Sequence, residues 1–192
     1  MTRRPMTVSA LDALGRVRLS RSFFLREFLY SEVAALHGIP NIPDDPDLAV
    51  MVGRRLCEDL LEPLQATFGK VVVRSAYRSC AVNGFCNDQQ RAGKAGYSCA
   101  SNEASYAGHI RDRRDAQGFA GATACIVIPW FADRFAAGAD WRAQTGGRWP
   151  GGCMIICPIP RCISFQSARP STSPGTSGQS GASTAMSRRV VA

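Results

Sequence analysis

Two histidines, His37 and His109, are the only imidazole side chains in this chain of 192 residues. Neutral imidazole is the commonest protein ligand for metal ions, and it also moves protons near neutral pH. His37 lies near the end of an expected short helix, where a structural role is the simpler interpretation, whereas His109 follows a long polar segment. We therefore expect His109 to be the better metal ligand of the two.

Eight cysteines form the second group of side chains that could bind a metal or react with oxidants. Cys80 and Cys86, and likewise Cys153 and Cys157, lack the paired Cys-x-x-Cys partners of a zinc ribbon. A zinc knuckle built from Cys153, Cys157 and Cys162 would lack a fourth ligand.

No secretory signal is visible, so we expect a cytoplasmic protein with reduced cysteines. A disulfide framework, or action in the periplasm or cell wall, would need an export route that the sequence does not show.

The net charge of +8 is concentrated towards the C-terminal end. Residues 1–142 contain 18 basic and 15 acidic side chains, whereas residues 143–192 contain five arginines and no acidic residue. Basic charge that belongs to a tail is weak support for a folded nucleic-acid interface. We expect a monomer with no nucleic-acid or membrane partner, and keep a small DNA-binding protein as a rival interpretation.

The pattern of apolar residues predicts helices in the first third of the chain. One is expected within FFLREFLYSEV, and Ser31 should begin a second, short one. The longest helix is expected over residues 47–68, where Pro63 should kink the last turns and Gly69 should end it.

Two β-branched, apolar runs follow these helices and predict strands, KVVVRS and GATACIVIP. Between them, residues 80–108 are rich in Gly, Asn and Ser and are expected to form a long loop. ADRFAAGADWRAQ is expected to form a short helix after the second strand. Helices that precede separated strands favour an α+β fold, with N-terminal helices packed on a small antiparallel sheet.

Four segments occur in a recognisable order: SRSFFLREFLYSEVAALHGIPNIP, then LCEDLLEPLQATFGKVVVRSAYRS, then AGHI and GATACIVIP. The most specific feature is the succession of a helix, LEPL, FG, a strand and the motif S-x-Y-R-S. In this order the chain resembles the M15 family of zinc D-Ala-D-Ala carboxypeptidases, which have the hedgehog/DD-peptidase fold. The resemblance covers roughly residues 20–142.

The resemblance implies roles for residues at the end of the first strand. Ser75, Tyr77, Arg78 and Ser79 match the family motif SGYRS, with Ala76 where the family has glycine. Arg78 would bind the terminal carboxylate of a peptidoglycan-type peptide, for which a planar guanidinium is well suited. Ser75 and Tyr77 would belong to the same substrate site. The structural alternative is that Arg78 caps the loop or pairs with an acidic residue.

The resemblance also implies a catalytic zinc ion with His109 as a ligand. Cys125 stands where the family has an aspartate, and a thiolate binds zinc well, although a single cysteine in an apolar strand is more often part of the core. Asp115 or Asp112, in the insertion that follows His109, could supply a carboxylate instead. The family's His-x-His motif has no counterpart, because no histidine follows His109. We therefore expect weak or absent zinc binding and no hydrolysis.

Residues 143–192 differ in kind from the rest of the chain. SARPSTSPGTSGQSGASTAMS is poor in bulky apolar residues and cannot build a core. When the last base of each codon is read with the first two of the next, the chain from Pro150 allows WWLHDHLPYSSLYFFPK, a sequence with a His-x-His. We interpret the tail as out of frame from about residues 143–150, and a natural disordered tail is the plainer alternative.

The sequence thus predicts a flexible N-terminus over residues 1–19, a truncated M15-like domain over 20–142 and a low-complexity tail over 143–192. The predicted function is that of a zinc metallopeptidase for cell-wall peptides, defective as written. A non-catalytic peptidoglycan-binding or phage-structural module of the same fold is the alternative, because a fold does not fix an activity.

Overall fold

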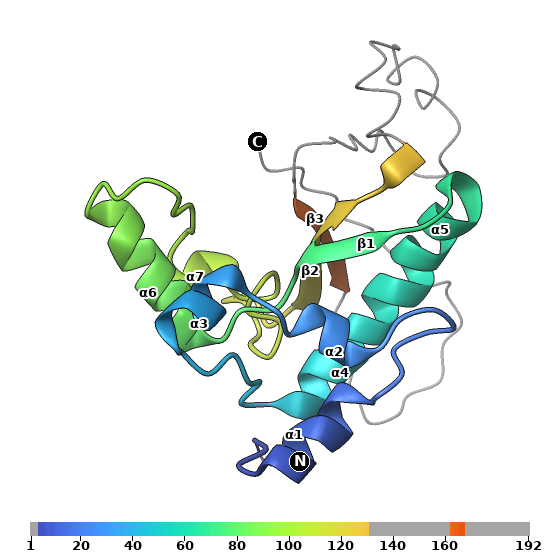
Figure 1. The fold of residues 1–192 in the computed structure, drawn as a ribbon, viewed down its shortest axis with the longest axis horizontal. Helices are drawn as coiled ribbons and strands as arrows, with labels where there is room; N and C mark the ends of the chain where they lie inside the picture. The colour runs from blue at the N-terminus through green and yellow to red at the C-terminus, as the bar shows by residue number, and fades with distance from the viewer. Residues whose placement is uncertain (1–3, 131–161, 168–192) are drawn as a thin grey trace, which may run out of the picture.

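The computed structural model describes residues 4–130 and 162–167, and Figure 1 shows their arrangement. The helices pack on a small antiparallel sheet, so the predicted α+β fold is confirmed. None of the described helices is long and apolar enough to cross a membrane. The elements in chain order are α1 (Val8–Gly15), α2 (Leu25–Phe28), α3 (Glu32–His37), α4 (Pro46–Leu56), the π-helix η1 (Cys57–Leu61), α5 (Glu62–Phe68), β1 (Val72–Ser75), α6 (Cys80–Arg91), α7 (Asn102–Ser105), β2 (Ala120–Val127) and β3 (Cys162–Ser167).

The sheet has the strand order β1-β2-β3, and both outer strands run antiparallel to β2. Ser75 pairs with Cys125, and the register shifts between Val73 and Ser75. Such an irregularity bends a strand and increases its twist, so β1 changes direction where the S-x-Y-R-S motif begins. On the other edge of β2, Cys125 pairs with Cys162.

One apolar core joins α2, the segment from α4 to α5, and one face of β2. Alternate residues of β2 belong to this core, namely Ala120, Ala122, Ala124 and Ile126. Because side chains alternate along a strand, Thr123 and Cys125 lie on the opposite face. The helices contribute larger side chains to the same core: Phe28, Val52, Leu56, Leu61 and Leu64.

The long predicted helix over residues 47–68 is present, with a different internal geometry. It runs from Pro46 to Phe68 and contains one π-helical turn, η1, ahead of Pro63. Proline lacks an N–H donor, so one bond of the helical ladder is missing at Pro63, and the π-helical turn, which Glu62 N closes by donating to Cys57 O, lies directly before it. The chain leaves the helix at Gly69, which has a φ of 83°, so the predicted end is confirmed.

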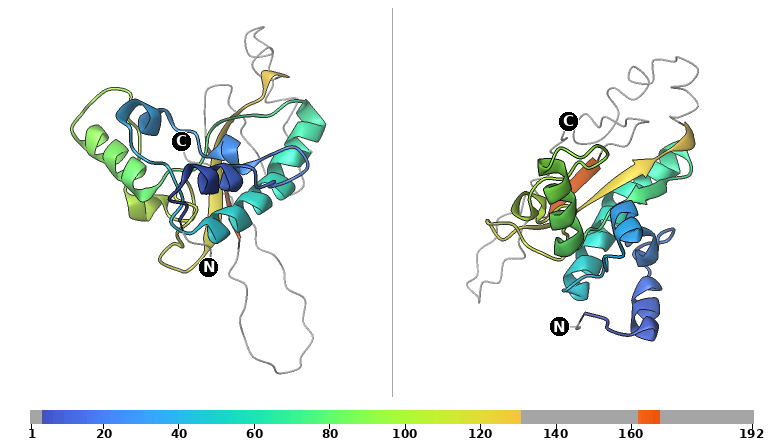
Figure 2. Two further views of the ribbon diagram at one scale, coloured as in Figure 1. Left: turned by 60° about the horizontal axis from the view of Figure 1, so that its bottom comes forward. Right: turned by 60° about the vertical axis from the view of Figure 1, so that its left-hand side comes forward.

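The long loop expected over residues 80–108 is wrong, because this segment contains α6 and α7. α6 buries Val82, Asn83 and Cys86. Val82, Phe85 and Cys86 have helical spacing, but the Asn, Gly and Asp residues among them are typical of loops and led to the loop prediction. We call residues 32–41 and 79–112, which contain α3, α6 and α7, the α6 lobe. It lies on one side of the sheet, with α4 and α5 on the other (Figures 1 and 2).

The N-terminal segment is more ordered than the sequence predicted. Thr7 caps α1 by accepting a hydrogen bond from Ala10 N at 3.2 Å. Asp12 of α1 forms an ion pair with Arg26 of α2. Leu19 is buried in the core with 1% of its surface exposed. The packed fold therefore begins before residue 20.

Most of the predicted tail, and the short helix expected within ADRFAAGADWRAQ, lie outside the described residues. The exception is β3, whose backbone pairs with β2 from Cys162 to Ser167. Backbone pairing places few demands on side-chain identity, so the strand is compatible with many sequences at these positions.

Candidate functional site

The S-x-Y-R-S motif leaves β1 and crosses from the core to the α6 lobe. Tyr77 is fully buried, and its backbone N–H donates to Phe28 O at 2.9 Å. Its hydroxyl donates to Asp112 Oδ2, 3.0 Å away. Ser75 is also buried, with 4% of its surface exposed. Both side chains are buried where the motif crosses, and their contact with substrate stays a prediction.

Asn41 fixes the path of this motif and was missed by the sequence analysis. Its amide nitrogen donates to Leu29 O at 2.9 Å and to Tyr77 O at 3.0 Å. Its amide oxygen accepts from Ser79 N at 2.7 Å. Ser79 in turn caps α6 through a hydrogen bond from Val82 N. Ser79 therefore has a structural role at the start of α6.

His109 lies beside this motif although 30 residues separate them in sequence. Its Nδ1 is 2.6 Å from Ala76 O, and Arg78 N donates to His109 O at 3.0 Å. A carbonyl oxygen only accepts hydrogen bonds, so Nδ1 is the donor, and in a neutral imidazole the lone pair then belongs to Nε2. A backbone carbonyl on one ring nitrogen is the usual way to orient a histidine whose other nitrogen binds a metal. This geometry suits His109 as a ligand through Nε2.

Arg78 is half-buried, and its Nη1 lies 2.9 Å from the sulfur of Cys99. Within the described part of the chain, no carboxylate forms an ion pair with it. The predicted structural alternative, pairing with an acid, is thus not what the described residues show. The charged guanidinium instead contacts a neutral sulfur.

Cys99 forms a disulfide with Cys86 of α6, with 5.8 Å between the Cα atoms. The expectation of reduced cysteines is therefore wrong for this pair. The sequence spacing gave no signal, because the partners are 13 residues apart and only the fold of α6 and the following turn brings them together.

The two carboxylates expected near the metal are engaged elsewhere. Asp115 Oδ1 accepts from Gln117 N at 3.0 Å and from Phe119 N at 2.8 Å, so it holds the turn that leads into β2. Asp112 is 3% exposed, and its Oδ2 accepts from Tyr77 and from Asp44 N. Both carboxylates therefore already accept hydrogen bonds that stabilise the structure around them.

Cys125 is buried on the face of β2 that is turned away from the apolar core. The segment that ends in His109 adjoins β2 here: Gly108 O accepts from Thr123 N at 3.1 Å, and a Cβ placed on Gly108 would lie 3.4 Å from Thr123 Oγ1. Thr123 and Cys125 share a face of β2, so Cys125 lies on the face that adjoins this segment. Even so, no three His, Cys, Asp or Glu residues of the described chain are gathered as a metal site. The described residues offer His109 as one well-oriented ligand and do not by themselves fit a catalytic zinc ion.

His37 contacts two aromatic residues of the α6 lobe. Its Nε2 is 2.7 Å from Tyr97 Oη, and its ring centre is 4.5 Å from that of Phe85. These contacts join α3 to α6, which agrees with the structural interpretation of His37.

Arg111 is the most unusual residue near the site, and no sequence pattern predicted its burial. It is fully buried, and none of its three guanidinium nitrogens has a hydrogen-bond partner in the described structure. The guanidinium carbon lies 5.1 Å from the ring centre of Phe28 and 5.9 Å from that of Tyr77. Burial lowers the pKa of Arg111 to about 10, because the charged form loses its hydration. Burial likewise raises the pKa of the Cys57 thiol to about 12.

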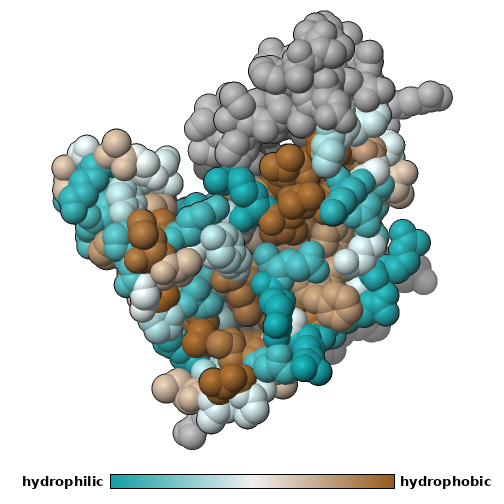
Figure 3. Space-filling model, in the orientation of Figure 1, coloured by the Kyte–Doolittle hydropathy of each residue, from teal (hydrophilic) through white to brown (hydrophobic). Residues whose placement is uncertain are grey.

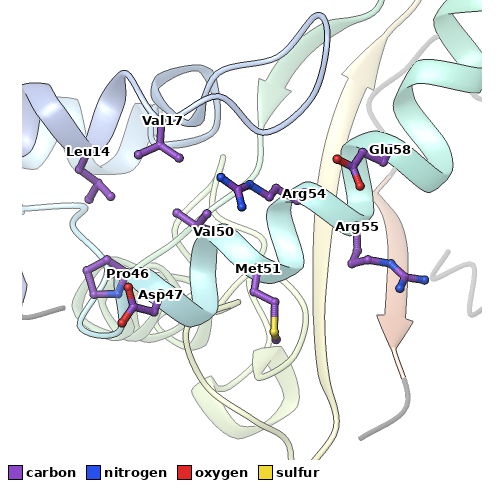
Figure 4. Close-up of a pocket in the computed structure, with 9 residues that line it drawn as sticks. All are labelled: Leu14, Val17, Pro46, Asp47, Val50, Met51, Arg54, Arg55 and Glu58. Carbon is purple, nitrogen blue, oxygen red and sulfur yellow. The ribbon is translucent and has the colours of Figure 1, made fainter. Parts of the chain in front are cut away.

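A separate groove of about 620 Å³ lies between α1 and α4 (Figure 4). Apolar side chains line it together with charged ones, including Val50, Met51, Arg54 and Glu58. None of the residues predicted to bind substrate or metal is among those that line it. On the face shown in Figure 3, a notch separates the α6 lobe from the rest of the molecule.

No family model, no curated protein and no solved structure matches the chain.

Proposed function

We propose that this chain is a defective zinc peptidase of the M15 type. It retains the means to bind the carboxylate of a cell-wall peptide and lacks a complete metal centre. The observation that carries this proposal is the contact between two segments of the resemblance. His109 is oriented by Ala76 O, and the backbone of Arg78 is bonded to His109 O. A potential ligand and a potential carboxylate receptor are thereby held side by side.

Arg78 is the residue of the motif that could meet a substrate. It is half-buried, and within the described residues no acid neutralises it, so its charge remains to be balanced by an anion. A guanidinium binds a carboxylate through two parallel hydrogen bonds, which fixes the direction of the bound peptide. Tyr77 and Asn41 would hold Arg78 in place from behind through their own hydrogen bonds.

The metal would supply a polarised carbonyl and an activated water when bound. His109 would be one protein ligand through Nε2. Cys125, on the adjacent face of β2, is the next candidate, whereas Asp112 and Asp115 would have to give up their present hydrogen bonds. The remaining ligand is expected from the His-x-His of the shifted frame, which the written chain does not contain.

A non-catalytic peptide-binding module is the second candidate. The observation that favours it is the same incomplete ligand set, since carboxylate binding by Arg78 needs no metal. In either case the disulfide suits a protein that matures in an oxidising compartment such as the one that borders the cell wall.

The test compares the written chain with a chain restored to the shifted frame after residue 150. We expect the restored chain to keep zinc through dialysis and to hydrolyse a peptide ending in D-Ala-D-Ala, and the written chain to do neither. His109→Ala in the restored chain should remove zinc and leave the fold intact by circular dichroism. If the restored chain retains no more zinc than the written one, the peptidase origin is wrong.

Peptide binding separates the two candidates. The written chain should bind a peptide ending in D-Ala-D-Ala more tightly than the same peptide with a C-terminal amide, and Arg78→Gln should abolish the difference. Binding without hydrolysis in both the written and the restored chain would favour the non-catalytic module.

A further inference from the structure

The sulfur of Cys99 connects the α6 lobe to Arg78. It is bonded to Cys86 of α6 and also receives Arg78 Nη1 at 2.9 Å. A disulfide sulfur carries no charge and is only a weak acceptor. The guanidinium therefore keeps its full positive charge for another anion as long as the disulfide is intact.

Neutral amides hold the backbone around Cys99 on α6 independently of the disulfide. Asn87 Nδ2 donates to Cys99 O at 2.7 Å, and Asn83 Nδ2 donates to the carbonyl of the next residue at 3.0 Å. Cys99 N donates to the side-chain oxygen of Gln90. Among the described hydrogen bonds to residues 99 and 100, the bond from Arg78 to the Cys99 sulfur is the one with a charged donor. We expect these amide contacts to keep the Cys99 sulfur beside Arg78 even without the S–S bond.

We propose that the Cys86–Cys99 disulfide keeps Arg78 available for a substrate carboxylate, and that reduction turns Cys99 into a thiolate that occupies Arg78 instead. A dithiol reductant would supply two electrons and two protons. The S–S bond breaks, both cysteines become thiols, and the reductant becomes a disulfide. The proton of the Cys99 thiol then passes to solvent, because the adjacent guanidinium stabilises the thiolate. The resulting ion pair neutralises Arg78 and closes the carboxylate site.

Access to the sulfur comes from the turn that precedes it. Cys86 and Cys99 are buried, with 3% and 5% of their surfaces exposed, whereas residues 91–96 are exposed. Local opening of such a surface segment is cheaper than global unfolding, so a dithiol can reach the disulfide without denaturing the core. The inference rests on the proposed role of Arg78 as a carboxylate receptor.

The first experiment tests the ion pair without any peptide. Cys86→Ser leaves Cys99 as a thiol beside Arg78, and its alkylation by iodoacetamide can be followed against pH by peptide mass spectrometry. We expect Cys99 to be about tenfold more acidic than an unperturbed thiol. Adding Arg78→Gln should return it to ordinary acidity. If Arg78→Gln leaves the alkylation profile unchanged, the thiolate does not pair with Arg78 and the inference is wrong.

The second experiment tests the consequence for binding. Cys86→Ser and Cys99→Ser both lack the disulfide, but only Cys86→Ser retains a thiol next to Arg78. At pH 8.5 we expect the peptide ending in D-Ala-D-Ala to bind Cys86→Ser about tenfold more weakly than Cys99→Ser, and the two to converge near pH 6, as the thiolate is protonated. Equal binding at both pH values would overturn the switch.

Two controls separate this inference from the proposed function. If the wild-type chain binds no such peptide, the carboxylate role fails, while the alkylation profile still decides whether the ion pair forms. If Cys86→Ser does not fold by circular dichroism, the wild-type chain reduced with dithiothreitol replaces it in both measurements. The oxidised wild-type chain should then bind the peptide more tightly than the reduced one at pH 8.5.

Discussion

The apolar core and the α6 lobe are stabilised in different ways. In the core, side chains of α2, α4, η1 and α5 pack on β2 and are almost completely withdrawn from water. In the α6 lobe, side chains bond to backbone groups, as Asn41, Asn83 and Asn87 do, and a disulfide closes the turn after α6. The core therefore depends on apolar area, and the lobe depends on individual polar contacts. Residues expected to carry function, Arg78 and His109, belong to the second kind of structure.

This difference predicts how far the effect of a substitution on stability should extend. Packing in a core is cooperative, so a cavity there weakens the whole domain. A lost hydrogen bond in the lobe should affect mainly the segment that it holds. Arg111 is the exception that connects the two, because it places a charge that has no hydrogen-bond partner among residues 4–130 against the ring of Phe28 at the edge of the core.

The largest effect is expected for Leu61→Ala in η1. Leu61 is fully buried in the core, and its truncation should lower the free energy of unfolding by about 2–5 kcal/mol. Urea denaturation followed by far-UV circular dichroism measures the change. Leu36→Ala is the matched control, because Leu36 is 76% exposed and should change stability by less than about 0.5 kcal/mol. Equal losses in the two variants would mean that the core is not where stability resides.

Replacing the buried cation should have the opposite sign. Arg111→Met keeps the length of the side chain and removes a charge that has no hydrogen-bond partner in the described structure. Uncompensated burial of charge is unfavourable, so we expect a gain of roughly 1–4 kcal/mol in the free energy of unfolding. Arg114→Met, at an exposed position, should change little. A marked loss of stability in Arg111→Met would show instead that the contacts of the guanidinium, such as those with the rings of Phe28 and Tyr77, outweigh the cost of its burial.

The smallest of the three effects is expected in the lobe. Asn41→Ala removes the acceptor of Ser79 N and the donor to Tyr77 O, which should cost about 1–2 kcal/mol. Amide hydrogen exchange should speed up at Ser79 and at the start of α6, with little change in β2. Gln117→Ala, at an exposed position, serves as the control. Faster exchange throughout β2 would instead show that the lobe and the core unfold as one unit.

Sequence patterns predicted the core better than the lobe. The spacing of Val52, Leu56 and Leu64 predicted the long helix, and the runs around Val72 and Ile126 predicted two paired strands. These features are visible in the sequence because the buried face of a helix or strand needs apolar side chains, which therefore recur with the period of that helix or strand. α6 escaped prediction because its apolar stripe is short and lies among Asn, Gly and Asp residues that are typical of loops.

The candidate site shows the same division. The sequence alone identified His109 and Arg78, because one is a rare imidazole and the other completes a motif. It also showed that residues 143–192 contain no histidine and no acid, so that the family's His-x-His is missing. Only the tertiary structure decided that Ala76 O orients His109, that Asp112 and Asp115 are engaged by backbone amides, and that Cys99 touches Arg78. Residue types and local periodicity can be read directly from the sequence. Contacts between residues 20 or 30 positions apart depend on how helices and strands pack, and therefore appear only when the core has placed them together.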